Sequence, residues 1–144
     1  MDYANIIFTV EDGIATIKLN RPKALNALNS EINADIMAAI NEVQADPSVR
    51  VLIVTGSERA FAAGADVKEM AEATPRYARE FCGLAIEINN ILESLPIPTI
   101  AAVGGFAFGE DAHLAVRSHF EGKREAGDTR ANYEKIYFVT HESG

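Results

Sequence analysis

Two apolar runs, each ending in a turn of small residues, constrain the fold of this chain more than any other feature. Residues 49–55 are almost continuously apolar and lead into Phe-Ala-Ala-Gly-Ala-Asp-Val-Lys-Glu-Met at 61–70. Residues 99–103 lead in the same way into Gly-Gly-Phe-Ala-Phe-Gly at 104–109. Such runs are typical of parallel strands covered on both faces. The pattern predicts two strands that end in small-residue turns, called below the Ala65 corner and the Gly109 corner.

The other segments alternate between strand and helix patterns. Residues 6–10 and 14–19 are rich in β-branched side chains, and the Glu-Asp-Gly between them predicts a hairpin. Helical spacing of apolar residues is present at 30–45, 75–95 and 111–126. Ser30 and Thr74 are the expected caps of the first two helices. Residues 136–139 are either an edge strand or an unpacked tail, and the order as a whole predicts an α/β fold with a partly parallel sheet.

The two corners predict a binding site if their strands are neighbours. In parallel sheets, ligands bind outside the carboxyl ends of the strands. Small side chains leave backbone amides bare, so one amide from each corner could converge on a single carbonyl oxygen. Such a pair would stabilise an enolate or a tetrahedral oxyanion, at roughly 3–4 kcal/mol per donor. The alternative is that the glycines merely end two strands.

Charge and cysteine content narrow the functional classes. The formal net charge of −8 argues against general binding to nucleic acid or to an anionic membrane. The single Cys82 excludes an internal disulfide and suits a reducing cytoplasm. Its position within an apolar helical pattern predicts a buried structural thiol. With no signal peptide and no apolar run long enough to cross a bilayer, we expect a cytoplasmic protein.

Four stretches resemble the enoyl-CoA hydratase/isomerase (crotonase) superfamily. Residues 61–70 look like its first oxyanion-hole motif, and residues 19–28 (Leu-Asn-Arg-Pro-Lys-Ala-Leu-Asn-Ala-Leu) are similar to its acyl-CoA loop. Residues 51–56 match the strand before the first motif, and residues 98–107 resemble the run into the second. The resemblance covers roughly residues 5 to 109 and implies a crotonase-like (ββα)-type spiral, here incomplete.

The resemblance also implies which residues bind the substrate. The oxyanion amide carries over to Ala65, and the carbonyl of Ala63 would meet the adenine of coenzyme A. The remaining positions implied to bind coenzyme A are Lys23, Ala24, Leu25, Gly64, Asp66 and Lys68, with the lysines as a local basic cluster. Coenzyme A would enter as part of the substrate, with no separate cofactor and no metal. By analogy with the family, the chain would form a homo-oligomer, a trimer or a hexamer.

The sequence departs from the family after Gly109. A gapless alignment places Glu110 at the second oxyanion amide and His113 where hydratases have a catalytic carboxylate. In a second alignment, residues 110–126 resemble the family's C-terminal helical segment, so that the central part of the fold is absent. Residues 1–126 would then be a truncated acyl-CoA-binding domain, and residues 127–144 a divergent tail.

Two hypotheses follow. The first is an enzyme that adds water across the 2,3 double bond of an enoyl-CoA, with Glu110 or His113 handling the proton. The second is a shortened domain that binds acyl-CoA, or only self-associates, without turnover. Because a chain with half the family's sheet should expose apolar surface, both hypotheses predict self-association.

Overall fold

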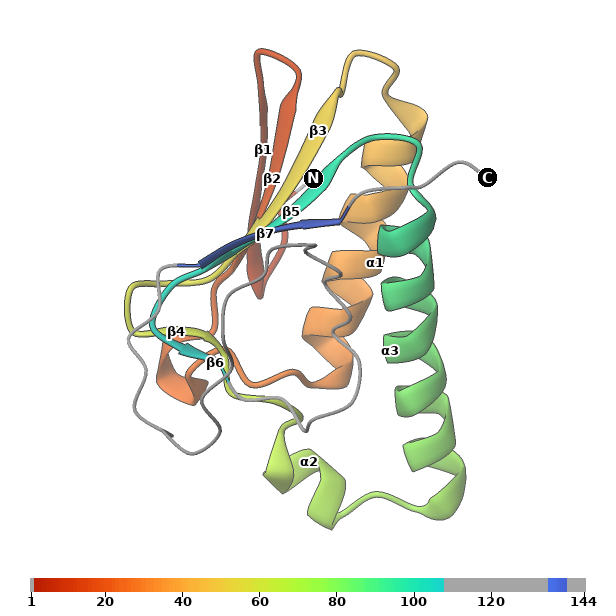
Figure 1. Ribbon diagram of the computed structural model, residues 1–144. Coiled ribbons are helices and arrows are strands. Elements are labelled where there is room, and N and C mark those ends of the chain that lie inside the picture. The colour runs from red at the N-terminus through yellow and green to blue at the C-terminus, as the bar shows by residue number, and fades with distance from the viewer. Residues whose placement is uncertain (1, 108–134, 140–144) are drawn as a thin grey trace, which may run out of the picture.

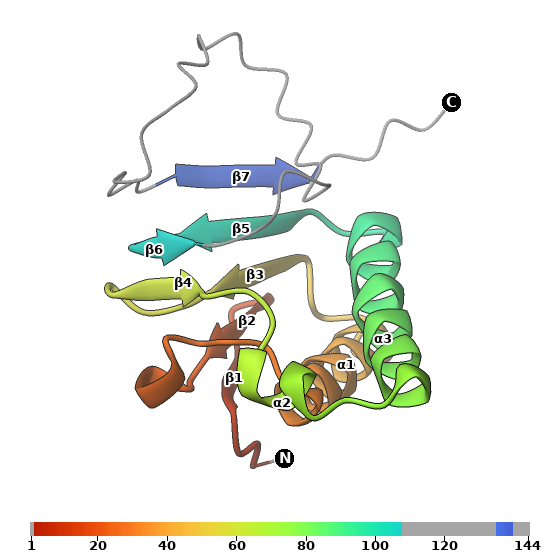
Figure 2. The same ribbon diagram turned by 90° about the horizontal axis from the view of Figure 1, so that it is seen from below.

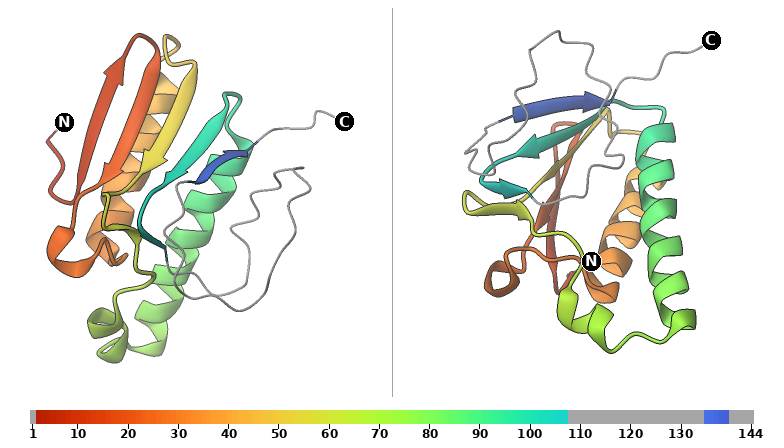
Figure 3. Two further views of the ribbon diagram at one scale, coloured as in Figure 1. Left: turned by 60° about the vertical axis from the view of Figure 1, so that its left-hand side comes forward. Right: turned by 60° about the horizontal axis from the view of Figure 1, so that its bottom comes forward.

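A five-stranded sheet forms the centre of the computed structural model, which describes residues 2–107 and 135–139. Its strands lie side by side in the order β1-β2-β3-β5-β7 (Figures 1 and 3). The β1–β2 hairpin is antiparallel, β2, β3 and β5 are parallel, and β7 pairs antiparallel with β5. The bounds of the strands are Ile6–Glu11 for β1, Ile14–Leu19 for β2, Val51–Thr55 for β3, Thr99–Val103 for β5 and Lys135–Val139 for β7.

Two long helices, α1 (Ser30–Ala45) and α3 (Pro75–Ser94), pack side by side on one face of this sheet (Figure 2). The apolar positions of α1 fall three or four residues apart, so they form one buried stripe against the strands. The amphipathic helix α3 buries Phe81 and Ile88 in the same way. The core between helices and sheet consists of Ile6, Ala15, Ile17, Leu19, Ile32, Ile36, Ala39, Ile40, Val43, Val49, Leu52, Ala62, Ile88 and Leu95.

Shorter elements lie beyond the carboxyl ends of the parallel strands. Strand β4 (Ala60–Ala62) follows β3 and strand β6 (Phe106–Ala107) follows β5, and the two pair in parallel as a separate ribbon (Figure 2). After β4 comes the short helix α2 (Val67–Ala71). The connection from β2 to α1 contains a 3₁₀ turn, η1 (Pro22–Ala24).

The predicted hairpin, first two helices and parallel strands are confirmed, with two local corrections. Strand β3 begins at Val51 rather than at Val49, because the amide of Val49 closes a turn onto the carbonyl of Asp46 at 3.2 Å. The cap of α1 is Asn29 rather than Ser30, since the Asn29 side chain accepts a hydrogen bond from the amide of Ile32. The sequence predicted that both faces of the parallel strands are covered. In the described structure, α1 and α3 cover one face.

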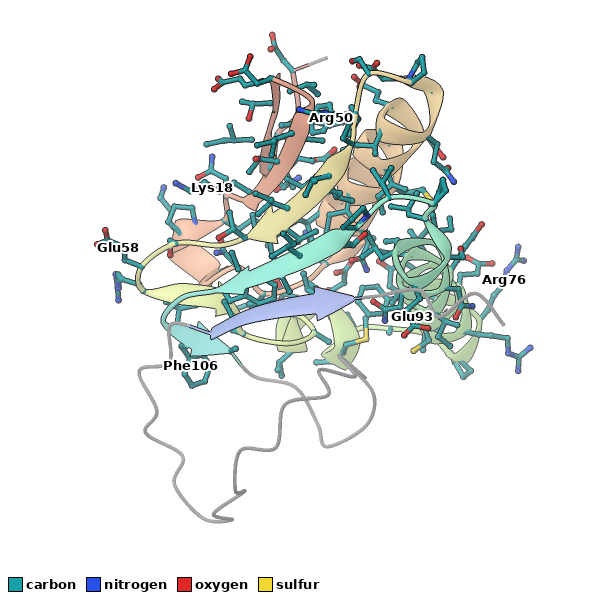
Figure 4. All side chains as sticks on the ribbon, turned by 45° about the horizontal axis from the view of Figure 1, so that its top comes forward. Lys18, Arg50, Glu58, Arg76, Glu93 and Phe106 are labelled. Carbon is teal, nitrogen blue, oxygen red and sulfur yellow. The ribbon has the colours of Figure 1, made fainter. Side chains whose placement is uncertain are left out.

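The prediction that Cys82 is a buried thiol is wrong, because Cys82 is exposed. Neighbouring residues of an α-helix point about 100° apart, and Phe81 takes the inward direction. Arg76 and Glu93, near the two ends of α3, also extend into solvent (Figure 4).

The edge-strand interpretation of residues 136–139 is confirmed by β7. The helix predicted over 111–126 and the rest of the tail lie outside the described residues. Among the helices of residues 2–107, none has the length and apolar character needed to cross a membrane.

Candidate functional site

The two predicted corners begin next to each other. In the β4–β6 ribbon, Ala60 is opposite Phe106 and Ala62 is opposite Ala107. Because the pairing is parallel, the chain leaves both strands in the same direction. Phe106 and Glu58, which lies in the β3–β4 connection, are found at one end of the molecule (Figure 4). The condition set by the sequence is met, since β3 and β5 are neighbours and the starts of the Ala65 and Gly109 corners lie together.

Two glycines allow this close approach. Gly105 has φ +66°, in the left-handed region, and a Cβ there would lie 2.5 Å from the carbonyl carbon of Arg59. A Cβ on Gly56 would lie 2.5 Å from the carbonyl oxygen of Ala60. A side chain at either position would therefore push the β3–β4 connection away from its neighbours.

The backbone amide of Ala65 is held in place by the residues on either side of it. Leu28 donates to the carbonyl of Gly64 at 2.7 Å and accepts from the amide of Asp66 at 2.8 Å. Successive amides of an extended chain point to opposite sides, so the N–H of Ala65 points away from Leu28. No hydrogen bond within residues 2–107 and 135–139 uses this N–H, and Ala65 is exposed. The Ala65 amide is thus a positioned donor without a partner in the described structure.

The carboxylate of Asp66 joins α2 to the β2–α1 connection. One oxygen accepts from the amide of Lys68 at 3.1 Å and caps α2, and the other pairs with the guanidinium of Arg21 at 3.1 Å. Partial burial raises the pKa of Asp66, but the hydrogen bonds from Arg21 and Lys68 outweigh it and hold the pKa below its ordinary value. Arg21 also donates to the carbonyl of Ala27.

Asn26 fixes the β2–α1 connection against β4. Its side chain is 1% exposed, donates to the carbonyls of Ala60 at 2.9 Å and Phe61 at 3.1 Å, and accepts from the amide of Arg21 at 2.8 Å. Its φ of +57° is one that asparagine tolerates better than most residues. The sequence places Asn26 in the 19–28 stretch but does not indicate this role, because the carbonyls that it bonds to lie 34 and 35 positions away.

Glu69 is a second residue that sequence reasoning missed. Its carboxylate accepts from the amide of Ser30 at 3.0 Å, from the Ser30 hydroxyl at 2.6 Å, and from the hydroxyl of Tyr77. Burial raises the pKa of Glu69, but these hydrogen bonds outweigh burial and lower it overall. In the sequence Glu69 belongs to the 61–70 stretch, and the structure places it in the first turn of α2.

The predicted coenzyme A residues fall into two segments that contact each other. Ala63, Gly64, Asp66 and Lys68 lie around the Ala65 corner, and Lys23, Ala24 and Leu25 lie in or beside η1. The Arg21–Asp66 ion pair and the Leu28 hydrogen bonds join the segments.

Lys23, Leu25 and Lys68 are exposed. Gly109, Glu110 and His113 lie outside the described residues. Within the part of the chain that the structure describes, no three His, Cys, Asp or Glu side chains are grouped as metal ligands.

Comparison with known proteins agrees with this geometry. The sequence profile of a family described as enoyl-CoA hydratase/isomerase matches residues 9–120. A crotonyl-CoA hydratase of Syntrophomonas wolfei is 42% identical over 121 residues, which are 83% of this chain and 46% of that protein. A short-chain-enoyl-CoA hydratase of Clostridium acetobutylicum is 41% identical over 117 residues, 81% of this chain and 45% of that protein.

Solved structures give the same result. An enoyl-CoA hydratase from Bacillus anthracis superimposes with a TM-score of 0.68 at 31% identity, over 71% of this chain and 40% of that one. An enoyl-CoA hydratase/isomerase from Xanthobacter autotrophicus Py2 gives a TM-score of 0.67 at 36% identity, over 72% and 40%. The chain spans less than half the length of these relatives.

Proposed function

The chain belongs to the enoyl-CoA hydratase/isomerase family and has its α/β crotonase fold, and from this premise we propose that it binds acyl-CoA thioesters and hydrates 2-enoyl-CoA. One observation supports the proposal above the others. Leu28 bonds to Gly64 and Asp66 on either side of Ala65, and the Ala65 N–H points away from Leu28 and has no partner among the described residues.

In the proposed reaction the Ala65 amide donates to the thioester oxygen. The oxygen of water adds to C3 of the enoyl group, and a proton is added at C2. The 2-enoyl thioester thereby becomes a 3-hydroxyacyl thioester. Negative charge develops on the thioester oxygen during the addition. A fixed donor stabilises this charged transition state more than it stabilises the bound substrate. Gly109 and Glu110 would supply the second amide, and Glu110 or His113 would transfer the proton.

Coenzyme A would lie across the joined segments. Lys23 and Lys68 are exposed cations on η1 and on α2, where they could meet phosphates despite the net charge of −8. Ala63 and Gly64 would present backbone to the adenine end, with Ala24 and Leu25 beside it. Asp66 would contribute by holding α2 to Arg21.

A hydration assay with crotonyl-CoA tests the proposal, because loss of the conjugated double bond lowers the thioester's ultraviolet absorbance. We expect turnover by the chain, and its loss in Glu110→Gln or His113→Ala. A calorimetric titration with crotonyl-CoA accompanies the assay. Binding without turnover would support the alternative, a crotonase-like domain that binds acyl-CoA without catalysis, and absence of binding would contradict both.

We propose further that the chain acts in fatty acid metabolism in the cytoplasm as a homo-oligomer, a trimer or a hexamer by family analogy. A cytoplasmic location is supported by the lone cysteine, which is exposed and would remain a free thiol under reducing conditions. Neither a nucleic acid nor a membrane is a proposed partner, and coenzyme A is proposed only as part of the substrate.

A further inference from the structure

The helix that follows the Ala65 corner has little buried apolar surface. Helix α2 has five residues and buries none of them, and Val67 at its start is 78% exposed. Burial of apolar surface is the usual means by which a short helix keeps its position. Polar contacts are therefore the main restraint on α2 and on the Ala65 amide before it.

These contacts join the end of the β2–α1 connection and the start of α1 to the Ala65 corner and α2 at several positions along the chain. Leu28 bonds to Gly64 and Asp66 on either side of Ala65, and two residues later Ser30 bonds to Glu69. The backbone carbonyl of Asp66 also accepts from the amide of Met70 at 3.0 Å, so α2 continues directly from the Ala65 corner. Any rotation of α2 about the Leu28 contact would turn the Ala65 amide with it.

Glu69 links α2 to both long helices. Its carboxylate joins three helices: α2, which contains it; α1, through the backbone and hydroxyl of Ser30; and α3, through Tyr77. Asp66, by comparison, joins α2 only to Arg21 in the β2–α1 connection. Among the side chains of α2 in the described structure, the Glu69 carboxylate alone bonds to other helices.

We propose that Glu69 is a positioning residue that directs the Ala65 amide at the thioester oxygen by holding α2 against Ser30 and Tyr77. The inference rests on the proposed function, since it needs a thioester at that amide. Glu69 itself does not touch the reacting atoms. Loss of the carboxylate leaves a folded protein whose Ala65 donor is misdirected, so ligand binds but is poorly polarised.

The test uses the full chain and a cinnamoyl-CoA thioester, whose absorption moves to longer wavelength when its carbonyl oxygen accepts strong hydrogen bonds. At saturating ligand we expect Glu69→Ala to lose more than half of the wild-type shift, and Glu69→Gln to keep an intermediate shift because its amide oxygen still accepts from Ser30. If crotonyl-CoA is turned over, kcat should fall about tenfold with KM changed less than about threefold. Glu72→Gln is the matched control, since Glu72 ends the same helix, is exposed, and has no side-chain partner among the described residues.

The outcomes separate the two proposals. Absence of a wild-type shift together with absence of binding overturns the proposed function. A wild-type shift that Glu69→Ala retains in full, in a variant with wild-type circular dichroism, overturns the positioning role and leaves the function standing. If Glu69→Ala does not fold, Ser30→Ala and Tyr77→Phe each remove a donor to the carboxylate, and a full shift in both overturns the inference.

Discussion

Asn26 shows how one polar side chain can hold the candidate site together. It is almost fully buried, and it donates to the carbonyls of Phe61 and of Ala60, the second of which also accepts from the amide of Ser57. An unsatisfied buried carbonyl or amide costs about 1–3 kcal/mol, so the bonds of Asn26 matter more for what they prevent than for what they add.

We expect Asn26→Asp to lower the free energy of unfolding by about 2–3 kcal/mol. Aspartate has the same shape and tolerates the same positive φ, but it cannot donate and would place a carboxylate against the carbonyl oxygens of Ala60 and Phe61. Urea denaturation measures the effect. Asn41→Asp on the exposed face of α1 is the control, and equal stability of the two variants would contradict the role of Asn26.

Acidification should destabilise the protein through Asp66 and Glu69. Their folded-state pKa values lie below the ordinary values of 3.8 and 4.5, so the unfolded chain binds protons more readily. Their contribution to the free energy of unfolding is therefore complete above about pH 4.5 and is lost as the pH falls through the folded-state pKa values.

The measurement for this prediction is a series of urea denaturations between pH 7 and pH 3. Asp66→Asn and Glu69→Gln should each lose less stability across the series than the wild type. Curves that run parallel to the wild type would show that neither carboxylate is responsible. Glu72→Gln should reproduce the wild-type curve.

At the scale of elements, the β4–β6 ribbon depends on the absence of a side chain at Gly105. Gly105→Ala should lower the free energy of unfolding by more than about 1–2 kcal/mol, the cost of a left-handed conformation alone, because the new Cβ also meets the Arg59 backbone. Gly104→Ala is the matched control, since its Cβ would meet only the carbonyl of Ser57 at 3.7 Å. Thermal unfolding of the two variants in parallel checks the prediction, which fails if Gly104→Ala is the more damaging.

The elements that the sequence predicted well are those with a local pattern. Helix α1 follows from apolar residues three or four apart, and the β1–β2 hairpin follows from two β-branched runs around Asp12-Gly13. The cap of α1 was missed by one residue, because Asn and Ser cap helices about equally well and Asn29 and Ser30 are adjacent. The prediction for Cys82 was wrong because an apolar pattern does not say which of two adjacent residues, Phe81 or Cys82, points inward.

The parts of the site that could not be predicted depend on distant partners. Asn26 bonds to residues 34 and 35 positions away, and Glu69 bonds to Ser30 across 39 positions. Nothing local to either residue indicates these partners. Likewise β4 and β6, with three and two residues, are too short for a periodic pattern, and the sequence did not predict their pairing.

At the scale of the whole molecule, the sheet face away from the helices has exposed apolar side chains beside polar ones such as Lys18. Ile7 and Ile14 alternate with the buried residues of the β1–β2 hairpin and are 46% and 42% exposed. Exposed apolar surface of this kind favours association. We therefore expect light scattering to give a mass above that of one chain, 15.6 kDa, at micromolar concentration. A single species of monomer mass would contradict the prediction.

The β4–β6 ribbon has a consequence for how the protein is made. Its strands pair residues near position 60 with residues near position 106, so their contact closes a long loop of chain. On the ribosome, the hairpin and α1 are synthesised first, whereas the ribbon must wait until Phe106 has left the exit tunnel. A nascent chain can therefore form most of its packed layers before the Ala65 and Gly109 corners are brought together.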